Sequence, residues 1–194
     1  QDAFGMHLAT LERFDDELPQ SLLEYEAATY YANIVLPYSA IVLKTLGKVT
    51  ATNWKIKIIA PDHGPIWRKQ LGWIIDLYKK WAAQKPTNKA VVLYATMWHS
   101  TEKMARAISE SLAEAGVKVG LVSMNDFHRS QAAYEVLDAG ALILGSSTLN
   151  NNMLPQMADV TTYLRGLKPA NLIGAAFGSF GWSGEGVRDL EAVL

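Results

Sequence analysis

One stretch restricts the fold more than any other. An apolar run suited to a β-strand, residues 91–95, passes through a loop rich in hydroxyl groups and directly into a helical pattern. Thr96, Ser100 and Thr101 can donate hydrogen bonds from this loop, and the free N–H groups at the start of the helix add to them. The loop lacks the patterns of a nucleoside triphosphate loop and of a dinucleotide turn. It is therefore suited to a phosphate, and to that of flavin mononucleotide (FMN) in particular.

Apolar runs and helical patterns alternate throughout the C-terminal half. This alternation predicts βαβ units and an α/β fold with a doubly wound parallel sheet, covered by helices on both faces. Ligands of such sheets bind at the carboxyl ends of the strands, near the point where the strand order reverses. We expect strands at residues 90–94, 118–123, 141–145 and 171–177, and helices at residues 101–115, 130–138 and 157–167.

Three loops follow strand ends and are expected to meet at that edge: residues 96–101, 146–152 and 178–184. The first would hold the phosphate, the second offers amides to a polar heterocycle, and the third combines glycines with two aromatic rings that can stack. The alternative is that they are ordinary loops rich in turn and helix-capping residues. The predicted FMN contacts are Thr96, Met97, Trp98, His99, Ser100, Thr101, Ser147, Thr148, Leu149, Asn150, Asn151, Ser179, Phe180, Gly181, Trp182, Ser183 and Gly184.

The N-terminal half follows a different pattern, and a short polar run at residues 84–89 separates it from the rest. Apolar residues spaced by three or four predict a long amphipathic helix, which Pro37 should kink and Gly47 should end. We expect a helix over 22–46, a strand over 54–59, an irregular segment at 61–65 and a helix over 67–83.

Composition excludes several classes of function. The 194 residues are 49% hydrophobic and 19% charged, with a net charge of −1, which gives no reason to expect a nucleic-acid partner. No apolar run comes near the ~20 residues that span a bilayer, so we expect no membrane partner and a cytoplasmic protein. The absence of cysteine excludes disulfides, thiolate metal sites and cysteine nucleophiles. Redox chemistry would require an organic cofactor, or metals held by His and carboxylates.

Two residues of the N-terminal half are candidate metal ligands. Asp2 could bridge two cations through its two oxygens, and the imidazole of His63 suits iron or zinc. Taken alone, each could equally be a turn residue or a helix cap. His7 is a weaker candidate that suits a supporting position, and His128 reads as a solvated loop residue. The acidic run at residues 12–17 reads as a wet surface.

Several motifs together resemble those of one family. Residues 88–194 resemble a flavodoxin-type domain, and the run Tyr-Ala-Thr-Met-Trp-His-Ser-Thr-Glu-Lys-Met-Ala at 94–105 closely resembles the phosphate loop of the flavodiiron proteins, or A-type flavoproteins. Residues 2–5 and 60–68 resemble the end of that family's metallo-β-lactamase-like domain. The resemblance implies the C-terminal part of such an αββα domain over 1–85. A flavodoxin-like domain would follow over 86–194, without its last strand and helix.

The resemblance also implies roles for the two candidate ligands. The family pattern runs His-x-Glu-x-Asp-His, then a further His, a bridging Asp and a final His. Asp2 and His63 match the last two in context and separation, and would act in catalysis through iron. The earlier ligands of the pattern are missing, so two irons could not be held by this segment alone. We expect the sequence to be the interior of a longer polypeptide.

The activity implied by the resemblance is an FMN- and di-iron-dependent reduction of O₂ to water, of NO to N₂O, or both. An external electron donor would be a rubredoxin, a flavin reductase or a reduced deazaflavin. A head-to-tail homodimer would bring the FMN of one subunit beside the irons of the other. Two alternatives remain: a flavodoxin-like electron carrier with a metal-free N-terminal scaffold, and a zinc hydrolase of metallo-β-lactamase type.

Overall fold

A computed structural model describes residues 2–194, which form two compact units. The N-terminal unit extends to Gln84, and the C-terminal unit comprises Lys85–Leu194. Each is described by itself.

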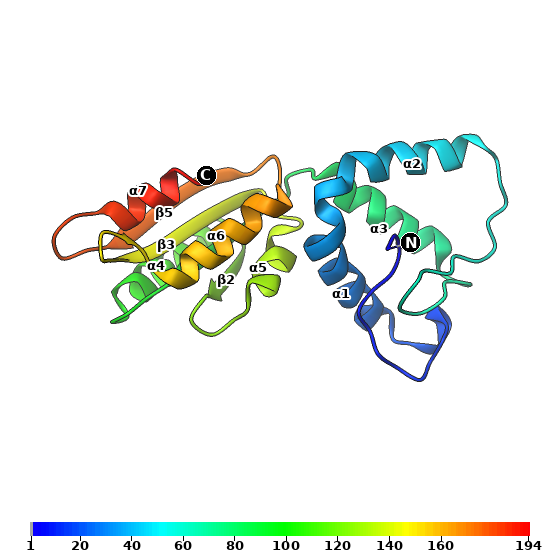
Figure 1. Ribbon diagram of the computed structural model, residues 1–194, viewed down its shortest axis with the longest axis horizontal. Helices are drawn as coiled ribbons and strands as arrows, with labels where there is room; N and C mark the ends of the chain where they lie inside the picture. The colour runs from blue at the N-terminus through cyan, green and yellow to red at the C-terminus, as the bar shows by residue number, and fades with distance from the viewer. Residues whose placement is uncertain (1) are drawn as a thin grey trace. The chain divides into compact units, whose positions relative to one another are not determined.

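Helices dominate the N-terminal unit (Figure 1). The predicted long helix is interrupted close to Pro37, which has no N–H to donate and so forces a change of hydrogen-bonding pattern. Gly47 was expected to end the helix, and this is wrong, because α2 continues to Ala51 and Asn53 beyond it adopts the left-handed conformation (φ 56°). The helical segments are α1 (Gln20–Tyr30), a π turn (Tyr31–Val35), a 3₁₀ turn (Leu36–Tyr38), α2 (Ser39–Ala51) and α3 (Leu71–Ala83).

The strand expected over residues 54–59 does not form. Ile59 alone pairs with Trp67, through N–H···O distances of 3.0 and 2.9 Å, in an isolated antiparallel bridge. A β-strand exists only through its neighbour, and no described residue offers a ladder to positions 54–58. Alternation of apolar side chains was therefore not sufficient to specify a strand here.

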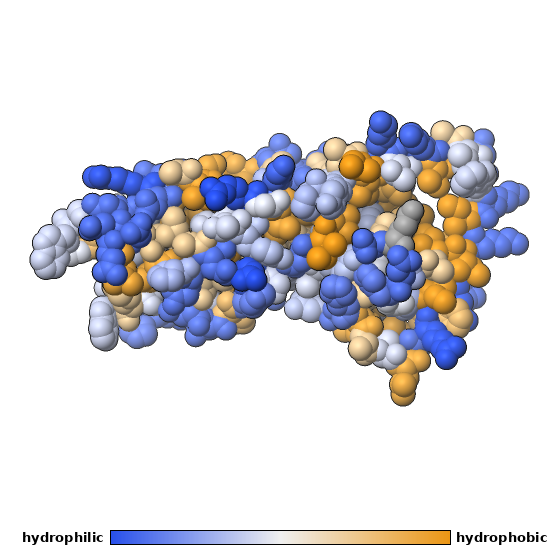
Figure 2. Space-filling view, in the orientation of Figure 1, coloured by the Kyte–Doolittle hydropathy of each residue, from blue (hydrophilic) through white to orange (hydrophobic). Residues whose placement is uncertain are grey.

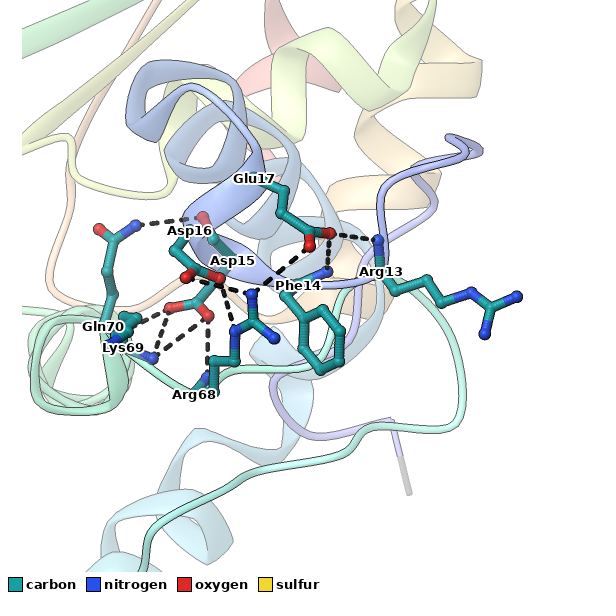
Figure 3. A network of polar contacts seen from close by, with 8 residues as sticks. All are labelled: Arg13, Phe14, Asp15, Asp16, Glu17, Arg68, Lys69 and Gln70. Atoms are coloured by element: carbon teal, nitrogen blue, oxygen red, sulfur yellow. Dashed lines mark hydrogen bonds and ion pairs between the residues drawn. The ribbon is translucent and has the colours of Figure 1, made fainter.

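The predicted acidic surface is correct for Glu12, Asp16 and Glu17, which are exposed, but wrong for Asp15, which is completely buried. Its carboxylate accepts hydrogen bonds from the backbone N–H groups of Arg68, Lys69 and Gln70, the closest at 2.6 Å (Figure 3). These donors precede α3, whose first turn leaves N–H groups without helical partners. The contacts explain why α3 begins at Leu71, later than the sequence pattern suggested.

Hydrophobic side chains lie at the surface of the N-terminal unit (Figure 2), among them Tyr38, Ile41, Trp54 and Ile58. The segments from α1 to α2 follow one another without a gap, so Gln20–Ala51 forms one helical stretch of 32 residues. Its most apolar 18-residue window has a mean hydropathy of 1.3. By length and composition it meets the requirements of a spanning helix, which corrects the expectation drawn from the sequence. A single such helix is weak support for a membrane span, since core helices pass the same test.

The C-terminal unit is a helix-covered sheet whose four long strands are parallel, in the order β2-β1-β3-β5. This is the doubly wound arrangement expected from the sequence. The strands are β1 (Lys89–Ala95), β2 (Lys118–Ser123), β3 (Ala141–Leu149), β4 (Asn152–Met153) and β5 (Ile173–Ser179). The helices are α4 (Ser100–Glu114), α5 (Arg129–Val136), α6 (Pro155–Leu167) and α7 (Glu185–Glu191).

Both faces of β1 are covered. Val92 and Tyr94 pack with Ala105 of α4 in one cluster, whereas the alternate residues Val91 and Leu93 are buried on the other face, as the pleat requires. Helices α5 and α6 lie side by side and contact β1 (Figure 1). The central strand is therefore fixed on both sides, and its carboxyl end presents the loop that follows in a defined position.

The second predicted loop is shorter than expected, because β3 continues through residues 146–149. It then turns back to pair with the short antiparallel strand β4, in the register Thr148–Met153 and Leu149–Asn152. Asn150 and Asn151 form the turn with φ of 49° and 59°. Asparagine tolerates this left-handed conformation better than most residues, which explains the asparagine-rich sequence.

Candidate functional site

The loop after β1 is held in place by a residue that the sequence analysis did not single out. Asn125 follows β2, and its side chain accepts from the Thr96 N–H at 2.9 Å and donates to the Thr96 carbonyl at 3.2 Å. The Asn125 side chain thus hydrogen-bonds the peptide group before Thr96 and the one after it. The only signal in the sequence was an Asn placed just after a strand, which is too common to be diagnostic.

The Thr96 side chain carries a hydroxyl that makes no hydrogen bond within the described part of the chain. Its Oγ1 is buried and has no hydrogen-bond partner among residues 2–194. An unsatisfied buried hydroxyl costs about 1–3 kcal/mol, so it requires an explanation, and a ligand that the hydroxyl can bind is one. This orphaned hydroxyl, in a loop that opens a helix of 15 residues, fits the oxygens of a phosphate.

His99 has an unusual backbone conformation at the end of this loop. It precedes α4 with φ 64° and ψ 2°, a left-handed conformation that is uncommon for residues other than glycine. Its carbonyl accepts from the N–H of Lys103 at 3.0 Å, so the strained residue also begins the helical ladder. This conformation turns the chain sharply and lets the N–H groups of the first turn, from Ser100 onwards, face outward.

A short chain of charges runs along the first turn of α4. Glu102 accepts from His99 Nδ1 at 2.8 Å through one oxygen and from Arg106 at 2.7 Å through the other. These contacts, with His99 the largest contributor, lower the pKa of the Glu102 carboxyl below its ordinary value. The Nδ1 atom of His99, one of the predicted FMN contacts, is thus paired with Glu102.

The same three residues line a cavity of about 490 Å³ together with Tyr94, Met97 and Phe127. It lies between the phosphate loop and the loop that follows β2. Its wall is mainly polar and includes both charges of the Glu102–Arg106 pair. The candidate phosphate loop thus borders a hollow that reaches solvent.

Hydroxyl groups connect the three predicted loops. Thr101 Oγ1 lies 2.9 Å from Ser147 Oγ and 3.1 Å from Ser179 Oγ, and the two serine oxygens are 3.3 Å apart. Thr101 belongs to α4, Ser147 to β3 and Ser179 to the end of β5. The convergence expected at the carboxyl edge of the sheet is therefore present in the structure.

Close backbone packing holds the third loop against the second. A Cβ atom at Gly178 would lie 2.1 Å from the carbonyl oxygen of Ser146, so only glycine allows β5 to approach β3 there. Thr148 Oγ1 accepts from the Gly186 N–H at 3.2 Å, and Ser183 donates to Glu185 at 2.6 Å. These contacts order the two ends of the loop that contains Gly181 and Gly184.

The aromatic residues of these loops are open to solvent. Trp98 is 84% exposed and Trp182 is 98% exposed, with Phe180 also exposed. Met97 and Leu149 expose apolar surface as well. Large exposed aromatic side chains beside polar groups are typical of a surface that contacts a ring or a partner.

The two candidate metal ligands, both in the N-terminal unit, lie together. His63 Nε2 is 3.4 Å from Asp2 Oδ1, and His63 Nδ1 is 3.3 Å from the Met6 carbonyl oxygen. Because a carbonyl only accepts, Nδ1 carries a proton, and in the neutral imidazole the lone pair of Nε2 then faces the carboxylate. A metal-binding His usually donates its other N–H to a carbonyl in this way. The pair therefore suits a cation, although residues 2–194 contain no cluster of three or more candidate ligands.

Two aromatic side chains surround this pair. The Tyr30 hydroxyl lies 3.1 Å from His63 Nε2, and burial together with the Asp2 charge raises its pKa to about 12. The ring of His7 contacts Tyr30 edge-on, with centroids 4.8 Å apart, and lies 5.3 Å from the ring of His63. His7 therefore lies beside the pair, in the supporting position expected for it. His128 caps α5, accepting from the Ser130 N–H.

Comparison with known proteins agrees with this geometry. The Flavodoxin family matches residues 92–194. A nitric oxide reductase of Moorella thermoacetica is 46% identical over 193 residues, covering all of this chain and 48% of the relative. The solved rubredoxin oxygen:oxidoreductase of Desulfovibrio gigas superposes with a TM-score of 0.96 at 46% identity, covering all of this chain and 49% of that one. The flavodiiron protein of Giardia intestinalis gives 0.93 at 34% identity, with coverages of 99% and 47%. The chain spans about half the length of the curated relatives it matches.

Proposed function

Because this chain belongs to the flavodoxin family over residues 92–194 and, over its whole length, to the flavodiiron proteins, we propose that the complete polypeptide reduces O₂ to water, NO to N₂O, or both. The observation that carries the proposal is the convergence of three hydroxyl-bearing loops at one edge of a parallel sheet. That edge is where a doubly wound sheet binds its ligand.

FMN would be held by the C-terminal unit. The orphaned Thr96 hydroxyl, the N–H groups at the start of α4 and the hydroxyl of Thr101 would bind its phosphate. The β3–β4 turn and the glycine-containing loop after β5 would flank the ring, with Trp98 and Trp182 free to cover it. All of these groups are neutral, so the phosphate charge would be balanced mainly by the helix dipole.

Iron would be bound with the help of Asp2 and His63. A carboxylate and an imidazole with its lone pair directed outward are suitable ligands for two irons. Further ligands would have to come from elsewhere in the complete polypeptide, since these two lie in a cluster too small for a metal site. When bound, the flavin and the irons would together supply the electron transfer and the gas-binding positions that the reduction requires.

The electrons and the assembly are part of the same proposal. An external donor, of the rubredoxin, flavin reductase or deazaflavin kind, would supply the electrons. This segment itself has no cysteine that could bind an iron–sulfur module. One relative is named a rubredoxin-oxygen oxidoreductase, which favours rubredoxin for that protein. A head-to-tail homodimer would place the flavin of one subunit near the iron of the other.

One observation favours a second candidate function, a flavodoxin-like electron carrier with a metal-free N-terminal unit. Within residues 2–194, Asp2 and His63 converge without a third His, Asp or Glu ligand. A site with two ligands binds iron weakly, so the segment by itself would carry flavin alone. This candidate predicts flavin-dependent electron transfer without consumption of O₂ or NO.

The two candidates are separated by metal and flavin analysis of the anaerobically purified complete polypeptide, combined with O₂ and NO electrodes. The expected result is flavin and iron together, with gas consumption that depends on a reduced donor. Flavin without iron and without gas consumption would replace the first candidate by the second. Zinc without flavin would contradict both.

A further inference from the structure

The three linked hydroxyls form a closed ring. Thr101, Ser147 and Ser179 lie pairwise within 2.9, 3.1 and 3.3 Å, and each comes from a different structural element. Thr101 and Ser147 are buried. Each hydroxyl carries one proton, so a ring in which every member donates once and accepts once uses all three protons internally.

Such a ring has a cost and a benefit. Burying the Thr101 and Ser147 hydroxyls is unfavourable unless each finds a partner, and the ring, with the part-buried Ser179 as its third member, satisfies both without water. Because hydrogen bonds in series polarise one another, the ring also resists displacement of any one member. It therefore fixes the distance between the start of α4 and the ends of β3 and β5 before any ligand binds.

We propose that Ser179 is a positioning residue for the phosphate of the flavin nucleotide, acting through Thr101 and Ser147. The inference rests on the proposed function, since it presupposes that the phosphate loop binds FMN. Thr101 lies in the first turn of α4, in the same loop-to-helix segment as the orphaned Thr96 hydroxyl, whereas Ser179 contacts Thr101 from the end of β5. Ser179 thus holds Thr101 in place, and the effect of losing it should be confined to the phosphate end of the ligand.

The ring also differs from the other serine contacts at this edge. The neighbouring Ser146 donates to the carbonyl of Ser147 and accepts from the Leu154 N–H at 2.9 Å, both of them backbone groups. Its hydroxyl supports the strand and does not reach across to α4. Ser179, the one hydroxyl-bearing residue of β5, is the residue that reaches Thr101 from that strand.

The test compares FMN with riboflavin, which has the same ring and lacks the phosphate. Affinities are measured by flavin fluorescence for the wild type, Ser179→Ala and Ser179→Thr, in the complete polypeptide stripped of flavin. Ser179→Ala should weaken FMN about fivefold, the effect of one net hydrogen bond, and leave riboflavin within about twofold. Ser179→Thr, which keeps the hydroxyl, should restore most of the FMN affinity.

The double variant Ser147→Ala with Ser179→Ala gives a second, independent measurement. Because either change opens the ring, the combined loss of FMN affinity should be smaller than the product of the two single losses. Ser109→Ala is the matched control, since its hydroxyl bonds only within α4, to the Ala105 carbonyl at 2.8 Å. It should leave both affinities unchanged.

Three outcomes overturn the inference. Equal weakening of FMN and riboflavin by Ser179→Ala would mean general damage to the loop, and unchanged FMN affinity would mean that the ring does not matter. Purely multiplicative losses in the double variant would show that the serines act separately. In each of these three cases, a wild type that still bound FMN would leave the proposed function intact and exclude only the role of Ser179. A wild type that bound neither FMN nor riboflavin would contradict both the proposed function and the inference about Ser179.

Discussion

The Nε2 atom of His63 lies 3.4 Å from Oδ1 of Asp2, although 61 residues separate the two in the chain. The opposite nitrogen of the ring faces the Met6 carbonyl at 3.3 Å, which fixes the ring with its lone pair toward the carboxylate. Two groups that both offer electron pairs do not attract each other without a cation or the Tyr30 hydroxyl between them. This pairing is the basis of the iron assignment in the N-terminal unit.

Replacing either ligand should release iron. We expect Asp2→Ala and His63→Ala, each made in the complete polypeptide, to lower iron affinity by about 100-fold or more, since loss of an outer partner alone costs about 10- to 100-fold. The measurement is metal content after anaerobic purification, together with the rate of O₂ or NO consumption. Flavin content should not change, because the C-terminal unit binds it.

His128→Ala is the control for that experiment, since His128 is an exposed capping residue of α5 in the other unit. It should keep full iron content. Unchanged gas reduction by the Asp2→Ala protein would show that the metal assignment is wrong.

The buried carboxylate of Asp15 should matter more for stability than any acidic residue near it. Asp15→Ala leaves three backbone N–H groups before α3 without their acceptor, and we expect a loss of about 2–3 kcal/mol in the free energy of unfolding. Asp16→Ala removes only a solvent-accessible ion pair with Arg68 and should lower the free energy of unfolding much less than Asp15→Ala does. Urea unfolding measures both, and equal losses would contradict the capping role.

The left-handed conformation of His99 should be detectable as strain. His99→Gly and His99→Ala both remove the imidazole and its contact with Glu102, so they differ chiefly in their tolerance of φ 64°. We expect the glycine variant to unfold at a higher urea concentration, with an advantage of about 1 kcal/mol. An alanine variant of equal or greater stability would mean that the loop relaxes out of this conformation.

The Glu102 carboxylate should make stability depend on pH. Its hydrogen bonds with His99 and Arg106 lower its pKa in the folded protein below the ordinary value of 4.5. A lowered pKa means that the ionised form stabilises the fold, fully above the unfolded pKa and less as pH falls through the folded pKa. The difference in urea midpoint between the wild type and Glu102→Gln should be constant near neutral pH and shrink below pH 4.5.

The control for this series is Glu110→Gln, a change of the same kind on the same helix away from the phosphate loop. It should show no comparable dependence. If the wild type remained more stable than Glu102→Gln by the same amount in acid, the ionised Glu102 carboxylate would be excluded as the source of that stability.

Local pattern predicted the C-terminal unit well. The expected strand at residues 118–123 coincides with β2, and the helix expected at 101–115 differs from α4 by one residue at each end. Apolar strands buried on both faces and loops of turn-forming residues leave few alternatives for such a chain. Proximity of the three loops followed from the same reasoning, because parallel strands end at one edge.

The sequence pattern gave wrong predictions where the local structure depends on residues far away in the chain. Residues 54–59 alternate as a strand should, yet form none, because a ladder needs a neighbour. Gly47 resembled a helix end and lies inside α2, since tertiary packing decides whether a glycine stops a helix. The buried state of Asp15 could not be read from an acidic run, because its partners follow more than fifty positions later.

By itself, then, the sequence determined the doubly wound sheet and predicted a phosphate loop, because these follow from short-range periodicity and from the chemistry of loop residues. Asp2 and His63 remain predicted ligands, and that prediction depends mainly on the resemblance to the flavodiiron proteins. Only the tertiary structure decided that Thr101 shares its hydroxyl with Ser147 and Ser179, that Asn125 brackets Thr96 and that Tyr30 reaches His63. Hydrogen bonds between side chains depend on positions within a few tenths of an ångström, and those positions are set by how whole elements pack.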